Sequence, residues 1–512
     1  MFRHTIADPA RMLAALKTKP EEYWIARGER RVLKLFQLMA RRVPAYKHFL
    51  KKNGVNPERI RTMADFRILP ATDKENYLCS YPLKDLCWDG KLSEKQFIIS
   101  STSGSTGKPF YFPRQKWQDY EFALTLELLL RDFFAIEKKS TLFVDCFAMG
   151  VWIGGMYMYQ ALKYIADSGQ FKLSIITPGS YKEEAIKAVE QLGKEFEQVI
   201  IGGYAPLVKD LLDDGIAYGL DWKKYKVKFF FAAEGFSETF RDYVLRQVGA
   251  LNPYLSSFNH YGTADLGTMS HETPLSILLR RLATKNITLY QSVFLESNNQ
   301  PTLTQFIPEL FFFEEANKGL LCSSFSGLPL VRYDLKDRGG VFTLRDANHL
   351  YGEHQTDMIA EAKAAGVYPH IWNLPFVYVC ERADFTVSIY SVNIYPECIR
   401  RSLETNELQT MLTGKFTMLV RYDDRQNQYL EINAEMKHGI EDNDRLRKSA
   451  MEAIIKGLND ENSEWRDFYA DPGIRHKVTP RLVFWPYQSP TYFRAGAKQK
   501  WISKDLPYAT TV

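Results

Sequence analysis

Cysteine is scarce in this chain of 512 residues. Its six cysteines lie far apart, and no two of them have the Cys-x-x-Cys spacing of a redox motif or a zinc site. The sequence therefore indicates neither a disulfide framework nor a structural zinc ion, and it predicts reduced thiols with mostly structural roles. The six are Cys79, Cys87, Cys146, Cys322, Cys380 and Cys398.

Long apolar runs are also absent. No segment approaches the roughly 18 uninterrupted apolar residues that would indicate a membrane-spanning helix. The first residues, MFRHTIADPARMLAALK, place charges and Pro9 where a secretory signal would need a continuous apolar stretch. We therefore expect no membrane span and, by default, a cytoplasmic location.

Neither sign of charge dominates the chain. The 66 lysines and arginines slightly outnumber the 61 aspartates and glutamates, and the net charge of +5 is spread without a basic tail or an arginine-rich run. This distribution argues against a nucleic-acid partner. With 45% hydrophobic and 25% charged residues, the composition is that of a globular protein, and the length predicts a large domain with at least one smaller one.

Helices and short strands follow one another in a regular order. Residues 8–65 have the apolar spacing of amphipathic helices, and from Gln96 short apolar strands alternate with helices. This alternation predicts an α/β sheet with parallel strands, whose ligands bind outside the carboxyl ends of the strands. After about residue 380, two strands flank the turn RQNQ and predict a hairpin in a small α+β domain. The predicted parts are a helical N-terminal part of the large domain (1–95), its core (96–382) and a small C-terminal α+β domain (383–512).

A loop rich in glycine and hydroxyl groups follows the first of these strands. The stretch STSGSTGKP (101–109) offers backbone N–H groups that no large side chain shields, and such groups bind anions. It is not a Walker A loop, because only two residues separate Gly104 from Gly107 and Pro109 stands in place of the magnesium-binding hydroxyl. From these residues alone, a phosphate site of another kind and a surface turn both stay open.

Five stretches in the same order as known motifs give the loop a context. The loop resembles the S-[ST]-G-[ST]-T-G-x-P signature of adenylate-forming enzymes. The stretch RADFTVSIYSVNIYP (382–396) is similar, without a gap, to R-S-D-D-M-x-x-x-R-G-V-N-V-F-P of phenylacetate–CoA ligase-like proteins. The other three stretches are AAEG (232–235), YGTAD (261–265) and PLVRYDLKD (329–337).

The resemblance implies a fold and a reaction. The fold would be a large α/β domain with more than one sheet, followed by a small, mobile α+β domain. The reaction would be attack of a carboxylate on the α-phosphorus of ATP, which forms an acyl-adenylate and releases pyrophosphate, followed by acyl transfer to a thiol. The implied cofactors are ATP and Mg²⁺, the implied substrate is a hydrophobic or aromatic carboxylic acid, and the implied acceptor is coenzyme A (CoA).

The resemblance also implies roles for individual residues. The glycine-rich loop would hold the β- and γ-phosphates, Asp265 would bind the magnesium ion, and Asp337 would accept hydrogen bonds from both ribose hydroxyls, as an ionised carboxylate can. Without the resemblance, Asp337 would be interpreted as a turn aspartate. The implied nucleotide-binding residues are Thr102, Ser103, Gly104, Ser105, Thr106, Gly107, Lys108, Ala233, Glu234, Gly235, Tyr261, Gly262, Thr263, Asp337 and Arg382.

The implied catalytic lysine lies near the C-terminus. The stretch RAGAKQKWI (494–502) resembles R-S-x-G-K-x-K-R-V, the mobile loop that carries this lysine in the family. Aligning the two Lys-x-Lys pairs makes Lys498 the catalytic residue and Lys500 its competitor. Asp384 matches the hinge residue about which the small domain turns between the two half-reactions.

Departures from the family pattern keep alternatives open. Asp265 is one methylene shorter than the usual glutamate, and Ser391 stands where the family has a glycine that lets the pantetheine thiol approach. An amine, a hydroxyl or a protein cysteine is therefore an alternative acyl acceptor. A P-loop phosphotransferase and a non-catalytic nucleotide-binding descendant are alternatives to the ligase, and the N-terminal helices could carry a partner or homodimer contact.

Two further stretches have two interpretations each. The segment VWIGGMYMYQ (151–160) predicts either the floor of an acyl pocket or core packing. His349 and His354 could form a metal pair, but no third ligand has a supporting spacing and their flanks look like loops. We therefore expect these histidines to be solvated.

Overall fold

The computed structural model describes residues 8–102, 109–294, 300–316, 319–382, 387–405, 407–493 and 502. These residues form two compact units. The larger unit contains the described residues up to Ser100, Tyr111–Tyr204 and Leu211–Glu381. The smaller unit contains those of Ser101–Phe110, Ala205–Asp210 and the chain from Arg382 onward.

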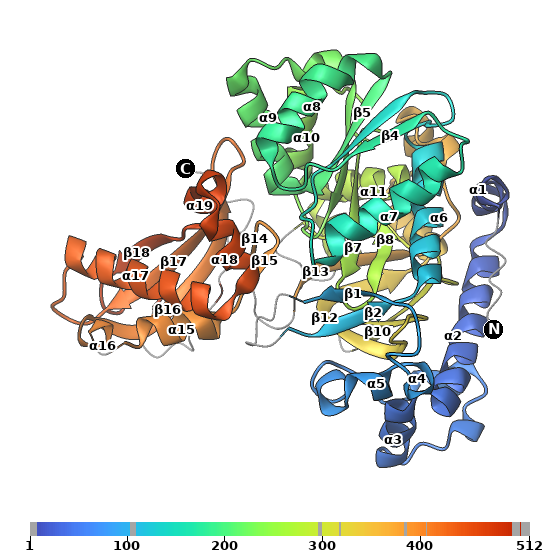
Figure 1. Ribbon diagram of the computed structural model, residues 1–512, viewed down its shortest axis with the longest axis horizontal. Helices are drawn as coiled ribbons and strands as arrows, with labels where there is room; N and C mark the ends of the chain where they lie inside the picture. Colours follow the sequence, from blue (N-terminus) through green and yellow to red (C-terminus); the bar gives the residue numbers. More distant parts are fainter. Residues whose placement is uncertain are drawn as a thin grey trace. The chain divides into compact units, whose positions relative to one another are not determined.

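An 11-stranded sheet forms the larger unit, in the order β10-β11-β12-β13-β9-β8-β7-β6-β5-β3-β4 (Figure 1). Strands β3 to β7 pair in parallel, as the alternation of strands and helices predicts. The pairs β7–β8, β8–β9, β9–β13, β10–β11 and β11–β12 are antiparallel. Its strands are β3 (Thr141–Asp145), β4 (Leu173–Ile176), β5 (Gln198–Tyr204), β6 (Val227–Ala232), β7 (Ser257–Thr263), β8 (Gly267–His271), β9 (Thr302–Gln305), β10 (Phe311–Ala316), β11 (Gly319–Ser324), β12 (Leu330–Phe342) and β13 (Phe376–Arg382).

Helices pack against this sheet, and the described residues include two large apolar cores between them. The first core packs Leu126 of α6 and Leu162 of α7 against β-strand residues that include Ile200 and Phe258. The second packs α11, α12 and α14 against β9 and β13. The helices are α1 (Pro9–Thr18), α2 (Glu21–Arg42), α3 (Pro44–Lys52), α4 (Met63–Arg67), α5 (Leu83–Leu86), α6 (Lys116–Asp132), α7 (Ile153–Asp167), α8 (Lys182–Leu192), α9 (Ala205–Tyr218), α10 (Glu238–Gln247), α11 (Pro274–Thr284), α12 (Ile287–Phe294), α13 (Leu344–Glu353) and α14 (Met358–Ala364).

The N-terminal helices belong to the larger unit and are held to it by specific contacts. Lys17 of α1 donates to Asp132 at the end of α6 over 2.6 Å, and Trp372 donates to the same carboxylate over 2.7 Å. The segment that follows α4 pairs with β12, since the amide of Thr72 donates to the carbonyl of Arg332 over 3.0 Å. Residues 8–95 therefore include part of the support for the central sheet.

The smaller unit has its own sheet, drawn in orange and red in Figure 1. Its order is β16-β17-β18, with β16 and β17 forming the predicted antiparallel hairpin and β18 parallel to β17. The predicted fold class, a large α/β part with a separate small α+β part, is confirmed. Its elements are β14 (Val387–Ile389), β15 (Val392–Ile394), α15 (Pro396–Leu403), α16 (Leu408–Met411), β16 (Leu412–Tyr422), β17 (Gln428–Met436), α17 (Asp444–Glu461), α18 (Ser463–Ala470), α19 (Pro472–Val478) and β18 (Arg481–Trp485).

A carboxyl group is buried at the end of β3. Asp145 has no exposed surface, one of its oxygens accepts from the amide of Phe147 over 3.2 Å, and the other has no partner among the described residues. Burial raises the pKa of this carboxyl from 3.8 to about 8. The native protein therefore binds a proton at neutral pH that the unfolded chain releases.

We expect Asp145→Asn to change how stability depends on pH. In the wild type, the stability that this protonated carboxyl contributes is complete below about pH 4 and is lost as the pH rises towards 8, by about 1.4 kcal/mol for each pH unit. The variant lacks this group and should not show the loss. The free energy of unfolding of the variant minus that of the wild type should therefore increase from pH 5 to pH 8. Urea titrations at several pH values measure the difference, and parallel curves would contradict the expectation.

Candidate functional site

The candidate site lies where β7 turns into β8 and faces β12. Four of its side chains form two hydrogen-bonded pairs between these segments. The hydroxyl of Tyr261 donates to Oδ2 of Asp337 over 2.5 Å, and the hydroxyl of Tyr333 donates to Oδ2 of Asp265 over 2.6 Å. The structure thereby brings together three of the residues that the sequence motifs single out, and it adds Tyr333.

Asp337 is a strand residue and not a turn residue. It lies within β12, and only 5% of its surface is exposed. The interpretation of Asp337 as a turn aspartate is therefore wrong. A buried carboxylate that already accepts a hydrogen bond from one hydroxyl has lone pairs left for further hydroxyl groups, such as those of a ribose.

A strained turn follows β6. Ala233 has a backbone φ of 76°, a conformation that residues other than glycine seldom adopt. At Gly235 a side chain would not fit, because a Cβ there would lie 2.8 Å from Oγ1 of Thr302. The side-chain amide of Asn259 donates to the carbonyl of Glu234 over 2.8 Å and so fixes the turn from the sheet. The motifs did not single out Asn259, and no contrast in polarity marks it, because its strand, SFNHYGT, is mostly polar.

A buried ionic network lies behind Asn259. The amide of Asn259 donates to Glu272 over 2.7 Å, and Glu272 receives two hydrogen bonds from Arg241 of α10. Arg241 also donates a hydrogen bond to Glu238, and Glu238 accepts another from Arg280 of α11. Burial alone would raise the pKa of Glu238, but the guanidinium groups of Arg241 and Arg280 hold it at about 2, so this carboxyl is ionised in the folded protein.

The glycine-rich loop is described only at its ends. The amide of Thr102 donates to the carbonyl of Phe110 over 2.9 Å, and the amide of Phe110 donates to Oγ1 of Thr102 over 3.0 Å. These two bonds close the base of the loop between β1 (Ile98–Ser101) and β2 (Tyr111–Arg114). Ser103, Gly104, Ser105, Thr106, Gly107 and Lys108 lie outside the described residues.

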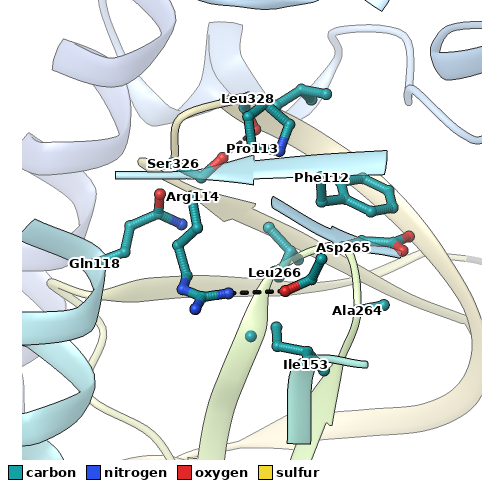
Figure 2. A pocket seen from close by; sticks show the side chains of 12 residues that line it. Phe112, Pro113, Arg114, Gln118, Ile153, Ala264, Asp265, Leu266, Ser326 and Leu328 are labelled. Carbon is teal, nitrogen blue, oxygen red and sulfur yellow. Dashed lines mark hydrogen bonds between the residues drawn. The ribbon is translucent and has the colours of Figure 1, made fainter. Parts of the chain in front are cut away.

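A small pocket borders Asp265 (Figure 2). One wall is polar: Arg114 donates to Oγ of Ser100 over 2.9 Å, and its guanidinium pairs with Asp119 over 2.5 Å. Gln118, Gly267 and Ser326 also line the pocket, and the remaining lining residues are apolar. They are Phe112, Pro113, Ile153, Ala264, Leu266 and Leu328.

Residues 151–160 contribute both to a pocket wall and to core packing, and an acyl group in that pocket stays a prediction. Ile153 lines the pocket, while Tyr157 and Met158 of the same helix are buried in the first apolar core. The segment therefore contributes to a pocket wall with one residue and to core packing with others.

The structure also describes the position that departs from the family glycine. Ser391 has a φ of 69° in the turn between β14 and β15, and the preceding Tyr390 has a φ of 50°. This left-handed conformation favours glycine, so serine is held here at a conformational cost of about 1–2 kcal/mol. The backbone at residue 391 is therefore one that a glycine could occupy without strain.

Other predicted residues are not placed by the structure. Arg382 is the last residue of β13, and its side chain is outside the described part. Asp384, Lys498 and Lys500 also lie outside the described residues. Their predicted roles stay predictions.

The described part of the candidate site offers carboxylate oxygens, but no cluster of metal ligands. Among the described residues, no group of three or more His, Cys, Asp or Glu side chains could hold a metal ion. A single carboxylate such as Asp265 fits Mg²⁺, which is usually bound by one or two carboxylates together with substrate phosphates. His349 lies within α13, and His354 is the residue that caps the end of this helix, so the expectation of loop-like flanks is wrong. The ring of His354 forms a hydrogen bond with the hydroxyl of Ser292 over 2.9 Å.

Comparisons with known proteins agree with these observations. No protein-family model matches the chain. The phenylacetate-coenzyme A ligase of Thermus thermophilus is 27% identical over 145 residues, which are 28% of this chain and 31% of the relative. The chain thus aligns to about a third of the length of this curated relative.

Solved structures share the fold over nearly the whole chain. A 2-hydroxyisobutyryl-CoA ligase in complex with 2-HIB-AMP and CoA, in the thioesterification state, has a TM-score of 0.65 at 12% identity and covers 99% of this chain and 95% of its own. The same ligase in the postadenylation state with 2-HIB-AMP has a TM-score of 0.54 at 12% identity, and the match covers 96% of this chain and 92% of the ligase. The resemblance that the sequence motifs indicate is confirmed. None of the described helices has the length and apolar character needed to traverse a lipid bilayer.

Proposed function

Since this chain has the fold of the adenylate-forming enzymes and resembles their phenylacetate–CoA ligase-like branch in sequence, we propose that it activates a carboxylic acid with ATP. The carboxylate would attack the α-phosphorus, an acyl-adenylate would form and pyrophosphate would leave. The observation that carries the proposal is the pair of carboxylates, Asp265 and Asp337, that two tyrosine hydroxyls hold at one place. A ribose and a phosphate-bound cation need such acceptors.

Each part of the nucleotide would meet a different element of the chain. Asp337 would accept the ribose hydroxyls, and the turn at Ala233–Gly235 with Tyr261 would enclose the adenine. Asp265 would bind Mg²⁺, which neutralises phosphate charge and so favours the departure of pyrophosphate. The glycine-rich loop would hold the β- and γ-phosphates, because its unshielded N–H groups bind anions.

CoA is the acceptor that we propose for the acyl group, as in the curated relative by its name. Acyl transfer to an amine, a hydroxyl or a protein cysteine is the alternative, because Ser391 replaces the glycine that admits the thiol. A hydrophobic or aromatic acid is the proposed substrate class. Short hydroxy acids should be tested as well, because the polar wall of the pocket beside Asp265 could accommodate a hydroxyl group.

The test is acid-dependent exchange of labelled pyrophosphate into ATP, followed by product analysis. The proposal expects exchange with at least one acid, and formation of AMP and pyrophosphate once an acceptor is supplied. Release of ADP would indicate a phosphotransferase, and ATP binding without exchange for any acid would indicate a non-catalytic protein. Comparing CoA with amines in the same assay identifies the acceptor. The cytoplasmic location and the homodimer contact stay predictions from the sequence.

Asp337→Asn is expected to raise the KM for ATP by about 10- to 100-fold while changing kcat much less. The amide keeps the shape of the side chain but loses the charge, and a hydrogen bond to a charged acceptor contributes about 1.5–3 kcal/mol. Asp346→Asn is the matched control, because Asp346 is a carboxylate with a structural role at the start of α13. An unchanged KM in Asp337→Asn, or an equal rise in the control, would remove Asp337 from the nucleotide site.

A further inference from the structure

We propose that Tyr333 is a positioning residue that orients Asp265 for the magnesium ion of the nucleotide. This inference rests on the proposed function, since that function supplies the metal and the nucleotide. The motif resemblance gave roles to Asp265 and Asp337 but none to Tyr333. The structure shows that Tyr333 donates directly to the carboxylate that would bind the metal.

The four residues have a reciprocal arrangement. Tyr261 and Asp265 are four residues apart at the β7–β8 turn, and Tyr333 and Asp337 are four residues apart in β12. Each segment donates a hydroxyl to the carboxylate of the other, over 2.5 and 2.6 Å. The two segments are not neighbours in the sheet, because β13, β9 and β8 lie between β12 and β7. These side-chain bonds therefore link a metal position and a ribose position that the backbone ladder does not join directly.

Burial gives the Tyr333 bond its strength. Only 2% of the surface of Tyr333 is exposed, so little water competes for its hydroxyl. Hydrogen bonds from a hydroxyl to an ionised carboxylate are shorter than neutral ones and about twice as strong, and they strengthen further away from water. A buried phenol also has little freedom to turn away from the carboxylate it holds.

The backbone of β12 is adapted at both donor and acceptor. Arg332 (φ 47°) and Lys336 (φ 58°) have left-handed backbone conformations. Arg332 directly precedes the donor Tyr333, and Lys336 directly precedes the acceptor Asp337. Non-glycine residues keep such conformations only where their surroundings enforce them, and such positions cluster at functional sites.

The segment around Thr72 supplies this enforcement. The amide of Thr72 donates to the carbonyl of Arg332 over 3.0 Å, and the amide of Asp334 donates to the carbonyl of Thr72 over 2.8 Å. Asp73 pairs with Lys336 over 3.0 Å, and the guanidinium of Arg332 donates to the carbonyl of Leu69. The N-terminal part of the chain thus holds the irregular strand that presents Tyr333.

The length of the metal carboxylate gives Tyr333 its importance. Asp265 is one methylene shorter than the glutamate of the family pattern, so it reaches less far. The buried hydroxyl of Tyr333 holds one oxygen of Asp265 in place before any metal binds. The side chain of Asp265 then loses less conformational freedom when the metal binds. The metal site of this chain would therefore depend on Tyr333 more than a site with glutamate would.

The test is the magnesium dependence of ATP binding in Tyr333→Phe, measured by calorimetry, with pyrophosphate exchange measured in parallel. We expect the Mg²⁺ concentration for half-maximal binding to rise about tenfold, since a charge-assisted hydrogen bond is lost, with ATP affinity in EDTA unchanged. Tyr261→Phe is the matched control, because it removes the reciprocal hydroxyl. It should weaken ATP binding with and without Mg²⁺ and leave the Mg²⁺ concentration for half-maximal binding unchanged.

A double-mutant cycle separates positioning from structural support. If the inference holds, the effect of Tyr333→Phe should shrink when Asp265 is replaced by glutamate, because the longer carboxylate reaches the metal without help. Lower thermal stability in Tyr333→Phe with unchanged Mg²⁺ dependence would overturn the inference and leave Tyr333 a structural residue. A wild type that shows Mg²⁺-dependent ATP binding but no exchange with any acid would contradict the proposed function alone, because the calorimetric comparison still decides the inference.

Discussion

Arg241→Met is expected to lower the free energy of unfolding by about 3–5 kcal/mol, the usual cost of removing one partner from a buried ion pair. Arg241 has no exposed surface, and all of its described hydrogen bonds are internal. It donates twice to Glu272, once to Glu238, and over 3.0 and 2.7 Å to the carbonyl and hydroxyl of Ser257. Methionine fills a similar volume but leaves Glu272, which is itself fully buried, without its main source of positive charge.

Arg246→Met provides the matched control for this prediction. Arg246 lies in the last turn of the same helix, α10, and is exposed, so the same substitution there should change stability by about 0.5 kcal/mol at most. Chemical denaturation of both variants measures the difference. Equal losses in the two variants would show that the buried network contributes little to stability.

The same network also supports the proposed nucleotide site. Glu272 accepts from the amide of Asn259, and the side chain of Asn259 holds the carbonyl of Glu234 in the strained turn after β6. Loss of Arg241 should therefore loosen this turn before the protein unfolds. A rise in the KM for ATP at temperatures well below the unfolding transition would show this coupling.

Local sequence patterns predicted three of the parallel strands of the central sheet. The parallel strands β3, β5 and β6 are short apolar runs, each bounded by helices of amphipathic spacing, and this pattern depends only on neighbouring residues. The antiparallel half was not predicted, because its strand order is set by pairings between distant segments. β9 lies between β8 and β13, and β13 begins about 70 residues after β9 ends. No local periodicity encodes such a pairing.

The candidate site shows the same division. The resemblance to the family motifs indicated Asp265 and Asp337, because both stand at motif positions that carry a carboxylate. Tyr333 and Asn259 were missed, since their importance lies in contacts with residues far away in sequence. The bond between Tyr333 and Asp265 joins residues 68 positions apart. Only the repeated Tyr-x-x-x-Asp spacing hinted at it, and that spacing is too common to indicate a site alone.

Lys498→Ala is expected to lower acid-dependent pyrophosphate exchange by about 100- to 1000-fold, the usual effect of removing one donor aimed at developing charge. Negative charge moves onto the oxygens around the α-phosphorus as the carboxylate attacks and pyrophosphate leaves. A lysine at that point acts mostly in the transition state, so the Kd for ATP should change little. Exchange rates and calorimetric ATP binding separate the two effects.

Lys500→Ala is the control for this prediction, because Lys500 lies two residues away and carries the same charge. If Lys498 is the catalytic residue, Lys500→Ala should keep most of the exchange activity, whereas a reversal of the two results would transfer the role to Lys500. Activity unchanged in both variants would remove the C-terminal Lys-x-Lys pair from the mechanism. Acyl transfer from a preformed acyl-adenylate adds a second measurement. Lys498→Ala should affect this half-reaction much less, because the role predicted for the lysine is to stabilise charge that develops only while the adenylate forms.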